Sequence, residues 1–345
     1  MSFPAQPEAL SNAWLSEKLG EHLGDEIVSH EVEFFGEGAG IIGQVTRVHL
    51  TTKGGEPHSI IAKFPSPAAE NRAVAATYDM YSREVGFYQN VAPLISLRVP
   101  ACYFADFNPD TQDFVILMED LKGYRIGDQV AGCTEADALA VVRGIADLHA
   151  STWAFQDERV VSHNNPSQRD GMVAGFAMGW PVVEENFADL IPASAAALGA
   201  KMGAAVSRLL DAMCTDPVSI SHADVRLDNV FFGDDEIALV DWQSVCTSAP
   251  EQDLAYFVTQ SLADDVRRSR DWVGVYHEAL TSKGVDYPLE ACRERFRVSA
   301  LYLVCYAVVI AGTLDMGNER GQALARTLLG NSLRSLDELD AFELL

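Results

Sequence analysis

Apolar and polar residues alternate along much of the first third of the chain, with the two-residue period of half-buried strands. This alternation covers residues 27–35 and 45–52, and the segments 59–64, 100–107 and 113–118 are typical of three more strands. In residues 11–23 and 70–91, apolar side chains instead recur every three or four positions, which is the spacing of an amphipathic helix. We therefore predict a small antiparallel sheet with two helices for this part of the chain.

The remaining two thirds of the chain show helical spacing over residues 135–155, 193–213 and much of 252–344. Strand patterns are limited there to two short apolar runs around a polar loop within residues 219–245. A strand-rich part followed by a helix-rich part predicts an α+β protein with two lobes. We place an N-terminal lobe at residues 1–118, a hinge at 119–124 and a helical C-terminal lobe at 125–345.

Composition narrows the classes of partner. The 345 residues include 50 acidic and 25 basic side chains, for a formal charge of −25. Such a charge repels phosphate backbones and anionic lipids, so we expect neither nucleic acid nor a membrane as a partner. The uncharged stretch 298–314 is at the lower limit of membrane-spanning length, and we expect a buried core helix. Because the six cysteines form no C-x-x-C pair and no signal-peptide pattern is present, we expect a cytoplasmic protein with reduced thiols.

The strongest chemical signal is the segment HADVRLDN at residues 222–229, which is followed by an apolar run that ends at Asp241. This spacing is typical of the loop that performs phosphoryl transfer in kinases. A carboxylate is needed there to accept the proton of the attacking hydroxyl, which suits Asp224. Oxygen ligands are needed for Mg²⁺, which suits Asn229 and Asp241. A surface loop would not require this combination.

Two further residues of the loop are less specific. Arg226 lies two positions after Asp224 and could stabilise the transferred phosphoryl group as a second cation, or could form a structural ion pair. For His222 we expect a structural role, in which hydrogen bonds of its ring fix the loop.

A glycine cluster precedes the second predicted strand. Gly38, Gly40 and Gly43 fit the pattern G-x-G-x-x-G, which also occurs in dinucleotide-binding folds. A strand rather than a helix follows here, and this order favours a flap whose backbone N–H groups face phosphates. The alternative is an ordinary glycine-rich hairpin.

Lys63 is unusual because it lies within an apolar strand, where an unpaired ammonium is costly. Glu84 lies four residues from both Met80 and Tyr88, which places a carboxylate among the bulky side chains of a helix. We predict that Lys63 and Glu84 form an ion pair that directs the ammonium toward nucleotide phosphates. Glu70 is the competing partner.

Four more positions complete the sequence-based assignment. The hinge would offer the Glu119 carbonyl and the Leu121 amide to an adenine ring, unless it is only a linker between the lobes. We expect Asp253 to brace the catalytic loop. His149, a single histidine on a predicted helix, is left out of the site.

The chain resembles the aminoglycoside phosphotransferase and choline kinase superfamily, and is most similar to its ecdysteroid-kinase-like bacterial members. Six segments in the family's order carry the resemblance: REVGFY at 83–88, LMEDL at 117–121, LHA at 148–150, HADVRLDN at 222–229, DWQ at 241–243 and QDLAY at 252–256. The resemblance implies a protein-kinase-like fold, ATP and Mg²⁺ as cofactors and transfer to a substrate hydroxyl. The chain departs from it at Ala223, where many relatives have glycine.

We therefore predict an ATP-dependent kinase of a small hydroxylated molecule. An apolar acceptor, steroid-like or hydroxyacyl, is the first candidate, and an aminoglycoside or another cationic alcohol is the second. The aromatic residues Phe176, Trp180, Phe187, Tyr302 and Tyr306 could line an acceptor pocket or simply pack in the core. The alternatives of another class are a pseudokinase scaffold, which would lack a base or a metal ligand, and a protein kinase, which would carry an A-P-E segment. No pattern in the chain predicts an oligomeric state.

Overall fold

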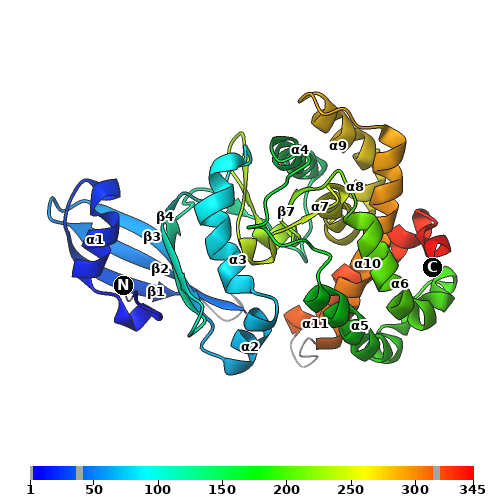
Figure 1. Cartoon of the computed structure of the whole chain (residues 1–345), viewed down its shortest axis with the longest axis horizontal. Coiled ribbons are helices and arrows are strands. Elements are labelled where there is room, and N and C mark those ends of the chain that lie inside the picture. The colour runs from blue at the N-terminus through cyan, green and yellow to red at the C-terminus, as the bar shows by residue number, and fades with distance from the viewer. Residues whose placement is uncertain (1–2, 36–41, 314–318) are drawn as a thin grey trace. The chain divides into compact units, whose positions relative to one another are not determined.

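The computed structural model describes residues 3–35, 42–313 and 319–345, drawn in colour in Figure 1. The chain forms two compact units. The first, called the sheet unit below, comprises Met1–Pro93, Val99–Gly123 and Asp241–Ser244. The second, called the helical unit, comprises Leu94–Arg98, Tyr124–Val240 and Val245–Leu345. A lobe boundary at residues 119–124 stays a prediction.

The sheet unit is built on five strands in the order β1-β2-β3-β5-β4, and every neighbouring pair is antiparallel. Each predicted strand of this region is present, with ends that differ by a few residues. The strands are β1 (Ile27–Phe34), β2 (Gly43–Thr52), β3 (Pro57–Pro65), β4 (Cys102–Asn108) and β5 (Asp113–Glu119).

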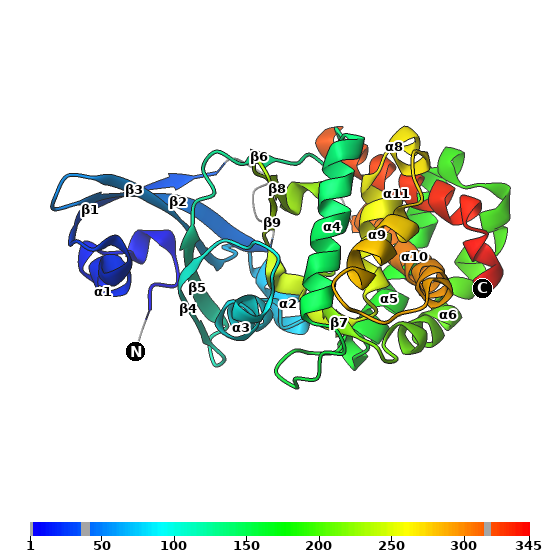
Figure 2. The same cartoon turned by 90° about the horizontal axis from the view of Figure 1, so that it is seen from above.

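Helix α1 (Asn12–Leu23) covers one face of this sheet (Figure 2). The Ser11 hydroxyl accepts a hydrogen bond from the Trp14 amide at 3.3 Å and begins the helix, and Gly24 ends it in the left-handed conformation. Leu15 and Leu19 are fully buried in the core that α1 forms with the strands. Alternate residues of the strands supply the other side of this core.

The prediction of a single helix over residues 70–91 is wrong, because the chain forms three shorter helical segments there. They are α2 (Ala69–Thr77), α3 (Met80–Gly86) and a π-helical turn at Phe87–Val91. Asp79 separates α2 from α3 with a φ of 54°, in the left-handed region that aspartate tolerates better than most residues. Helices α2 and α3 are therefore separate elements and not one continuous helix.

The helical unit contains eight helices within the described residues. They are α4 (Glu135–Ser151), α5 (Pro166–Asn186), α6 (Leu198–Met213), α7 (Glu251–Tyr256), α8 (Asp264–Arg268), α9 (Trp272–Thr281), α10 (Leu289–Thr313) and α11 (Glu319–Glu338). The short strands β6 (Arg125–Ile126), β8 (Val230–Phe232) and β9 (Ile237–Leu239) pair with one another, and β7 (Ser219–Ser221) pairs with β10 (Cys246–Ser248). Another π-helical turn follows α7 at Phe257–Ser261.

Short 3-10 turns complete both units, at Pro7–Ala9, Ala92–Leu94, Ala188–Leu190, Ala193–Ala197, Leu227–Asn229, Trp242–Ser244 and Ala341–Leu344. Most lie at the ends of longer elements. The turn at Ala193–Ala197 occupies the start of the helix predicted over residues 193–213, so that the α-helix proper begins at Leu198.

Helix α10 is long and apolar enough to cross a membrane, but most of its apolar stretch is buried inside the protein. It packs against α5, α6, α7 and α11 of the same unit. Nine residues of the helix between Ala300 and Ala311 are 0–2% exposed. This burial agrees with the core helix that we expected for this stretch.

Candidate active site

Lys63 is placed by the alternation of strand β3. Its neighbours Ala62 and Phe64 are fully buried in the core beneath α1. Because successive side chains of a strand point to opposite faces, Lys63 lies on the other face of the sheet. Helix α3 packs on β4 and β5 and carries Glu84.

The Lys63 ammonium makes two ion pairs. Its Nζ atom lies 2.9 Å from Oε1 and 2.6 Å from Oε2 of Glu84, and 2.6 Å from Oδ1 of Asp241. Burial alone would lower the pKa of Lys63, but the two carboxylates outweigh burial and raise the pKa above its ordinary value. The ammonium therefore stays charged at neutral pH. Glu84 is the partner of the lysine, whereas Glu70 is exposed.

The segment that ends the glycine cluster is held beside Lys63. A side chain at Gly43 would meet the Cε atom of Lys63 at 3.1 Å and the Phe64 carbonyl at 3.2 Å, so only glycine fits there without displacing the lysine. The Tyr81 hydroxyl donates a hydrogen bond to the Ile42 carbonyl at 2.7 Å and anchors the preceding residue. Gly38 and Gly40 lie outside the described residues.

The predicted hinge residues Glu119 and Leu121 flank a buried carboxylate that sequence reasoning did not single out. Asp120 accepts hydrogen bonds from Arg47 Nε at 2.8 Å and from the Ser59 hydroxyl at 2.6 Å. These contacts fix the segment after β5 to strands β2 and β3. The pKa of Asp120 is lowered, because its hydrogen bonds with Arg47 and Ser59 outweigh the effect of burial.

Asp241 and Trp242 belong to the sheet unit, although the chain on both sides of Asp241–Ser244 belongs to the helical unit. Asp241 adopts a φ of 66° and accepts a hydrogen bond from Gln243 Nε2 at 3.3 Å. The fully buried Trp242 ring stacks on Phe87 with 3.9 Å between ring centroids and 6° between planes. This stack fixes the position at which Asp241 meets Lys63.

The loop 222–229 lies in the helical unit, between β7 and β8, and Asp253 of α7 holds its first turn. The Asp253 carboxylate accepts hydrogen bonds from the Ser221 hydroxyl at 2.7 Å and from the amides of His222 and Ala223, each at 2.8 Å. Burial works against the charge, but these hydrogen bonds and His149 lower the pKa of Asp253. The carboxylate is completely buried and ionised.

Asp224, the predicted base, has a partly exposed side chain with polar neighbours. Asn229 Nδ2 donates to the Asp224 backbone carbonyl at 2.9 Å and to its Oδ2 at 3.2 Å. The Nε atom of Arg226 lies 3.8 Å from the same Oδ2. Burial and the adjacent Asp224 carboxylate raise the pKa of the Tyr256 hydroxyl well above its ordinary value. Tyr256 ends the segment QDLAY, and no role was predicted for it from the sequence.

The two histidines of this region act as bridges. His222 Nε2 lies 2.9 Å from the Val240 carbonyl, whereas its Nδ1 accepts the Asp224 amide at 3.3 Å. These two contacts tie the ring to the chain before Asp241 and to the backbone of Asp224. His149 is fully buried, with Nε2 at 3.2 Å from Asp253 and Nδ1 at 2.8 Å from the Tyr276 hydroxyl.

Gln129 is a loop residue that sequence reasoning missed. Its Oε1 accepts hydrogen bonds from the Leu227 amide at 2.8 Å and from the Ser261 hydroxyl at 3.0 Å. Its Nε2 donates to the Gln260 carbonyl at 2.9 Å. The side chain is fully buried, so Gln129 joins the second half of the catalytic loop to the π-helical turn after α7. A polar residue in a polar stretch gave no signal in the sequence.

Of the five aromatic residues considered for an acceptor pocket, four are buried in the core of the helical unit: Phe176, Trp180, Phe187 and Tyr302. Tyr306 is half-buried, and its hydroxyl accepts a hydrogen bond from Gln168 Nε2 at 2.7 Å. Core packing therefore accounts for most of this set.

Several solved structures have a similar fold. An ethanolamine kinase from Plasmodium vivax is 13% identical and matches with a TM-score of 0.56, over 94% of this chain and 88% of that one. An aminoglycoside 2'-phosphotransferase-IIIa, solved as a GDP complex, is 14% identical with a TM-score of 0.53, over 96% and 99%. A choline/ethanolamine kinase family protein from Mesorhizobium loti is 15% identical with a TM-score of 0.51, over 91% and 93%.

No curated protein matches the chain significantly. The model of the ecdysteroid kinase-like family, in contrast, matches residues 37–285, which is more than half of the chain. The matched region contains the Lys63 cluster, the segment 117–121, the loop 222–229 and Asp253. The chain therefore belongs to the ecdysteroid kinase-like family and is a small-molecule kinase with the protein-kinase-like fold.

Proposed function

We propose that this protein transfers the γ-phosphoryl group of ATP to a hydroxyl of a small molecule, with Asp224 as the general base. The observation that carries the proposal is the cluster of the buried Lys63 and Glu84 with the partly exposed Asp241, in which one cation is held by two carboxylates within 2.9 Å. A core stabilised only by packing would not contain such a cluster, because burying charge is costly. Kinases use this cation to position nucleotide phosphates.

The proposed reaction moves one proton and one phosphoryl group. Asp224 accepts the proton of the acceptor hydroxyl as the oxygen attacks the γ-phosphorus. The new O–P bond forms while the bond between the γ-phosphorus and the bridging oxygen breaks, and ADP leaves with that electron pair. The partly exposed position of Asp224 allows contact with an acceptor, and the Asn229 amide orients its carboxylate.

The nucleotide contacts follow from the same assignment. Lys63 binds the phosphates with Glu84 holding it in place, and Arg226 adds a second positive charge beside the base. We assign phosphate binding to Gly38, Gly40 and Gly43 on the basis of their spacing. We assign adenine binding to the Glu119 carbonyl and the Leu121 amide, which lie in the segment that Asp120 holds to strands β2 and β3.

Mg²⁺ would be held by Asn229 and Asp241. Their side chains fit a hard cation, because both offer oxygen ligands. Since Asn229 Nδ2 donates to Asp224, the amide is oriented by its nitrogen and its Oδ1 is the ligand atom. When bound, the metal ion supplies positive charge that neutralises the phosphates.

For the acceptor, we propose an apolar hydroxylated compound, steroid-like or hydroxyacyl, which the ecdysteroid kinase-like family favours. A cationic alcohol is the second candidate. The chain's net charge of −25 favours it, as do the aminoglycoside, choline and ethanolamine named for the similar structures. We place the reaction in the cytoplasm, because all six cysteines, which lie in described segments, are free thiols.

The test is ADP release with Mg²⁺ against hydroxylated steroids, hydroxyacyl compounds, choline-like alcohols and aminoglycosides, after ATP binding has been measured separately. Asp224→Asn keeps the shape of the base and should abolish acceptor-dependent turnover while ATP still binds. Asp235→Asn, at an exposed position of the turn between β8 and β9, is the control and should retain turnover. Turnover that survives in Asp224→Asn would refute Asp224 as the base, and absence of ATP binding would refute the proposal as a whole. ATP binding without any turnover would favour a pseudokinase.

A further inference from the structure

A cavity of about 340 Å³ lies in the helical unit, between the segment after β6 and helix α11. Its polar lining residues are Gln129, Ser261, Arg326, Thr327, Asn331 and Arg334. Val130, Leu190 and Ala263 add apolar surface. Ligand sites commonly combine this volume with apolar walls and a few polar groups.

The lining of this cavity contains basic but no acidic residues, unlike the protein as a whole. Two arginines line it, and the carboxylates that pair with them, Asp189 with Arg326 and Asp264 with Arg334, lie outside the lining. Acidic residues outnumber basic ones 50 to 25 in the whole chain, so an acid-free lining is not the average surface. Arg326 and Arg334 keep 46% and 44% of their side chains exposed, which leaves them accessible to a ligand.

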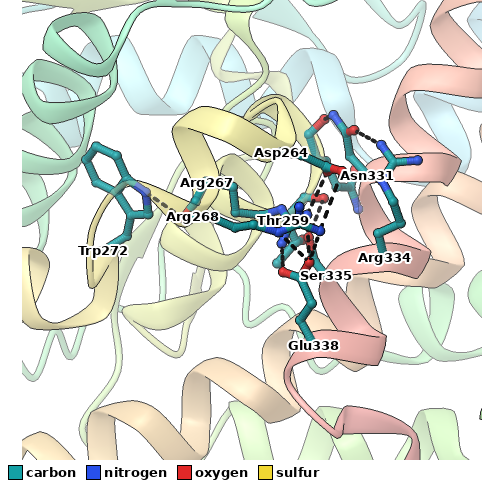
Figure 3. Close-up of polar contacts among 10 residues, drawn as sticks. Thr259, Asp264, Arg267, Arg268, Trp272, Asn331, Arg334, Ser335 and Glu338 are labelled. Atoms are coloured by element: carbon teal, nitrogen blue, oxygen red, sulfur yellow. Dashed lines mark hydrogen bonds and ion pairs between the residues drawn. The ribbon is translucent and has the colours of Figure 1, made fainter.

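Arg334 of α11 is held in place by a network of charged side chains (Figure 3). Arg334 Nε donates to Asp264 Oδ1 at 3.0 Å, and its Nη2 donates to the side-chain Oδ1 of Asn331 at 2.7 Å. Asp264 and Glu338 also bind Arg267 and Arg268 of α8. Three arginines thus share two carboxylates, so the network has a net charge of +1 before any ligand binds.

The cavity wall also contacts the catalytic loop. Gln129 and Ser261 both line the cavity, and Gln129 Oε1 accepts from the Leu227 amide and the Ser261 hydroxyl. The Gln129 backbone amide donates to Asp228 Oδ1 at 3.1 Å. A ligand that packs against this wall would restrain Gln129 and, through it, Leu227 and Asp228.

The geometry points to a binding site for a small molecule that carries an oxyanion and a short apolar part, and whose binding stabilises the Gln129 contact with the catalytic loop. The arginine guanidinium matches the planar shape of a carboxylate and the oxygens of a phosphate, so both head groups suit it. The apolar walls favour a hydrocarbon over free inorganic phosphate.

Octanoate and octyl phosphate are suitable probes, with octanol and octylamine as neutral and cationic controls. By calorimetry on the full chain, both anions should bind and the controls should not. Arg334→Gln should weaken binding about tenfold, as expected when one charged hydrogen bond is lost. Arg268→Gln is the matched control, because it removes an arginine that also pairs with Asp264 but does not line the cavity. Arg326→Gln tests the second cation, should Arg334→Gln fold poorly.

Hydrogen exchange tests the contact with the loop. Octanoate should slow exchange of the Leu227 amide in the wild type and leave it unchanged in Arg334→Gln. Equal binding of octanol, equal weakening by Arg268→Gln, or unaltered exchange at Leu227 in saturated protein would overturn the inference. None of these measurements uses turnover, so their outcome is independent of the proposed kinase reaction.

Discussion

The imidazole of His149 and the carboxylate of Asp253 meet at 3.2 Å, and both side chains are completely buried. Asp253 receives three further hydrogen bonds from the start of the catalytic loop, at Ser221, His222 and Ala223. One buried carboxylate therefore sets the position of a loop whose reactive residue comes directly afterwards. Its removal should affect both the free energy of unfolding and turnover.

Asp253→Asn should lower the free energy of unfolding by about 3 kcal/mol, because an amide has one acceptor oxygen where the carboxylate has two. Urea unfolding at pH 7 measures this change. Asp265→Asn, at an exposed position of α8, is the control and should change little. Since the folded pKa of Asp253 is lowered from 3.8, its contribution is present above that pH and is lost as the pH falls below it. The difference between wild type and variant should shrink in that acid range, and a pH-independent difference would contradict the assignment.

Lys63→Met should lower the free energy of unfolding by about 3 to 5 kcal/mol, because it leaves the buried Glu84 carboxylate without its cation. The double variant Lys63→Met with Glu84→Gln should recover much of this stability without recovering turnover. Chemical denaturation and ADP release measure the two effects separately. A double variant as unstable as the single one would show that the ion pair is not the source of the loss.

The pH dependence of wild-type turnover should show no lysine ionisation between pH 6 and 9. The two carboxylates raise the pKa of Lys63 above its ordinary 10.5, so its folded-state stabilisation is complete below that pH and is lost only at higher pH. The expectation would be contradicted if wild-type turnover fell at the alkaline end of pH 6–9 and this fall were absent in Lys63→Arg.

Glu251→Gln should raise the free energy of unfolding at pH 8 by about 1 kcal/mol. Burial raises the pKa of Glu251, so its ionisation destabilises the folded state as the pH rises from 4.5 through the folded pKa. Its neighbour Arg295 keeps hydrogen bonds to the carbonyls of Pro217 at 2.8 Å and of Met213 and Thr215, each at 3.0 Å. Wild type and variant should converge at pH 4, and a variant that is less stable at pH 8 would refute the expectation.

Ala223→Gly should raise the free energy of unfolding by about 0.5 to 1 kcal/mol. Ala223 has a φ of 63°, a left-handed conformation that is strained for alanine but not for glycine. Relief of this strain should exceed the stability lost because glycine gives the unfolded chain more conformational entropy. The control is Ala238→Gly in strand β9, which should destabilise. Thermal unfolding of both proteins provides the comparison.

Patterns that depend on local chemistry were readable from the sequence. Lys63 and Glu84 could be paired because each is out of place among apolar neighbours, and the structure brings them together. The loop 222–229 could be located because its spacing is set by the reaction. The five strands of the sheet could be recognised from short apolar segments, two of which alternate with polar residues.

Other features depend on tertiary contacts and gave no local signal. Helix α5 was not predicted, because its apolar residues form no single stripe and Pro181 lies inside it. Gly175 and Gly179 instead allow close approach of α10, since a side chain at Gly179 would meet the Val308 carbonyl at 2.6 Å. The contacts of Gln129 likewise depend on partners distant in the sequence.

The alternation of side chains between the two faces of β3 restricts where related proteins can gain or lose residues. Lys63 faces Glu84 only because Ala62 and Phe64 face the core under α1. Inserting or deleting one residue between the turn after β2 and Lys63 would exchange the two faces, bury the lysine in the apolar core and expose Phe64. Insertions and deletions in relatives should therefore be absent from β3 and be confined to the turn at residues 53–56, where the length of the hairpin can change without moving the register.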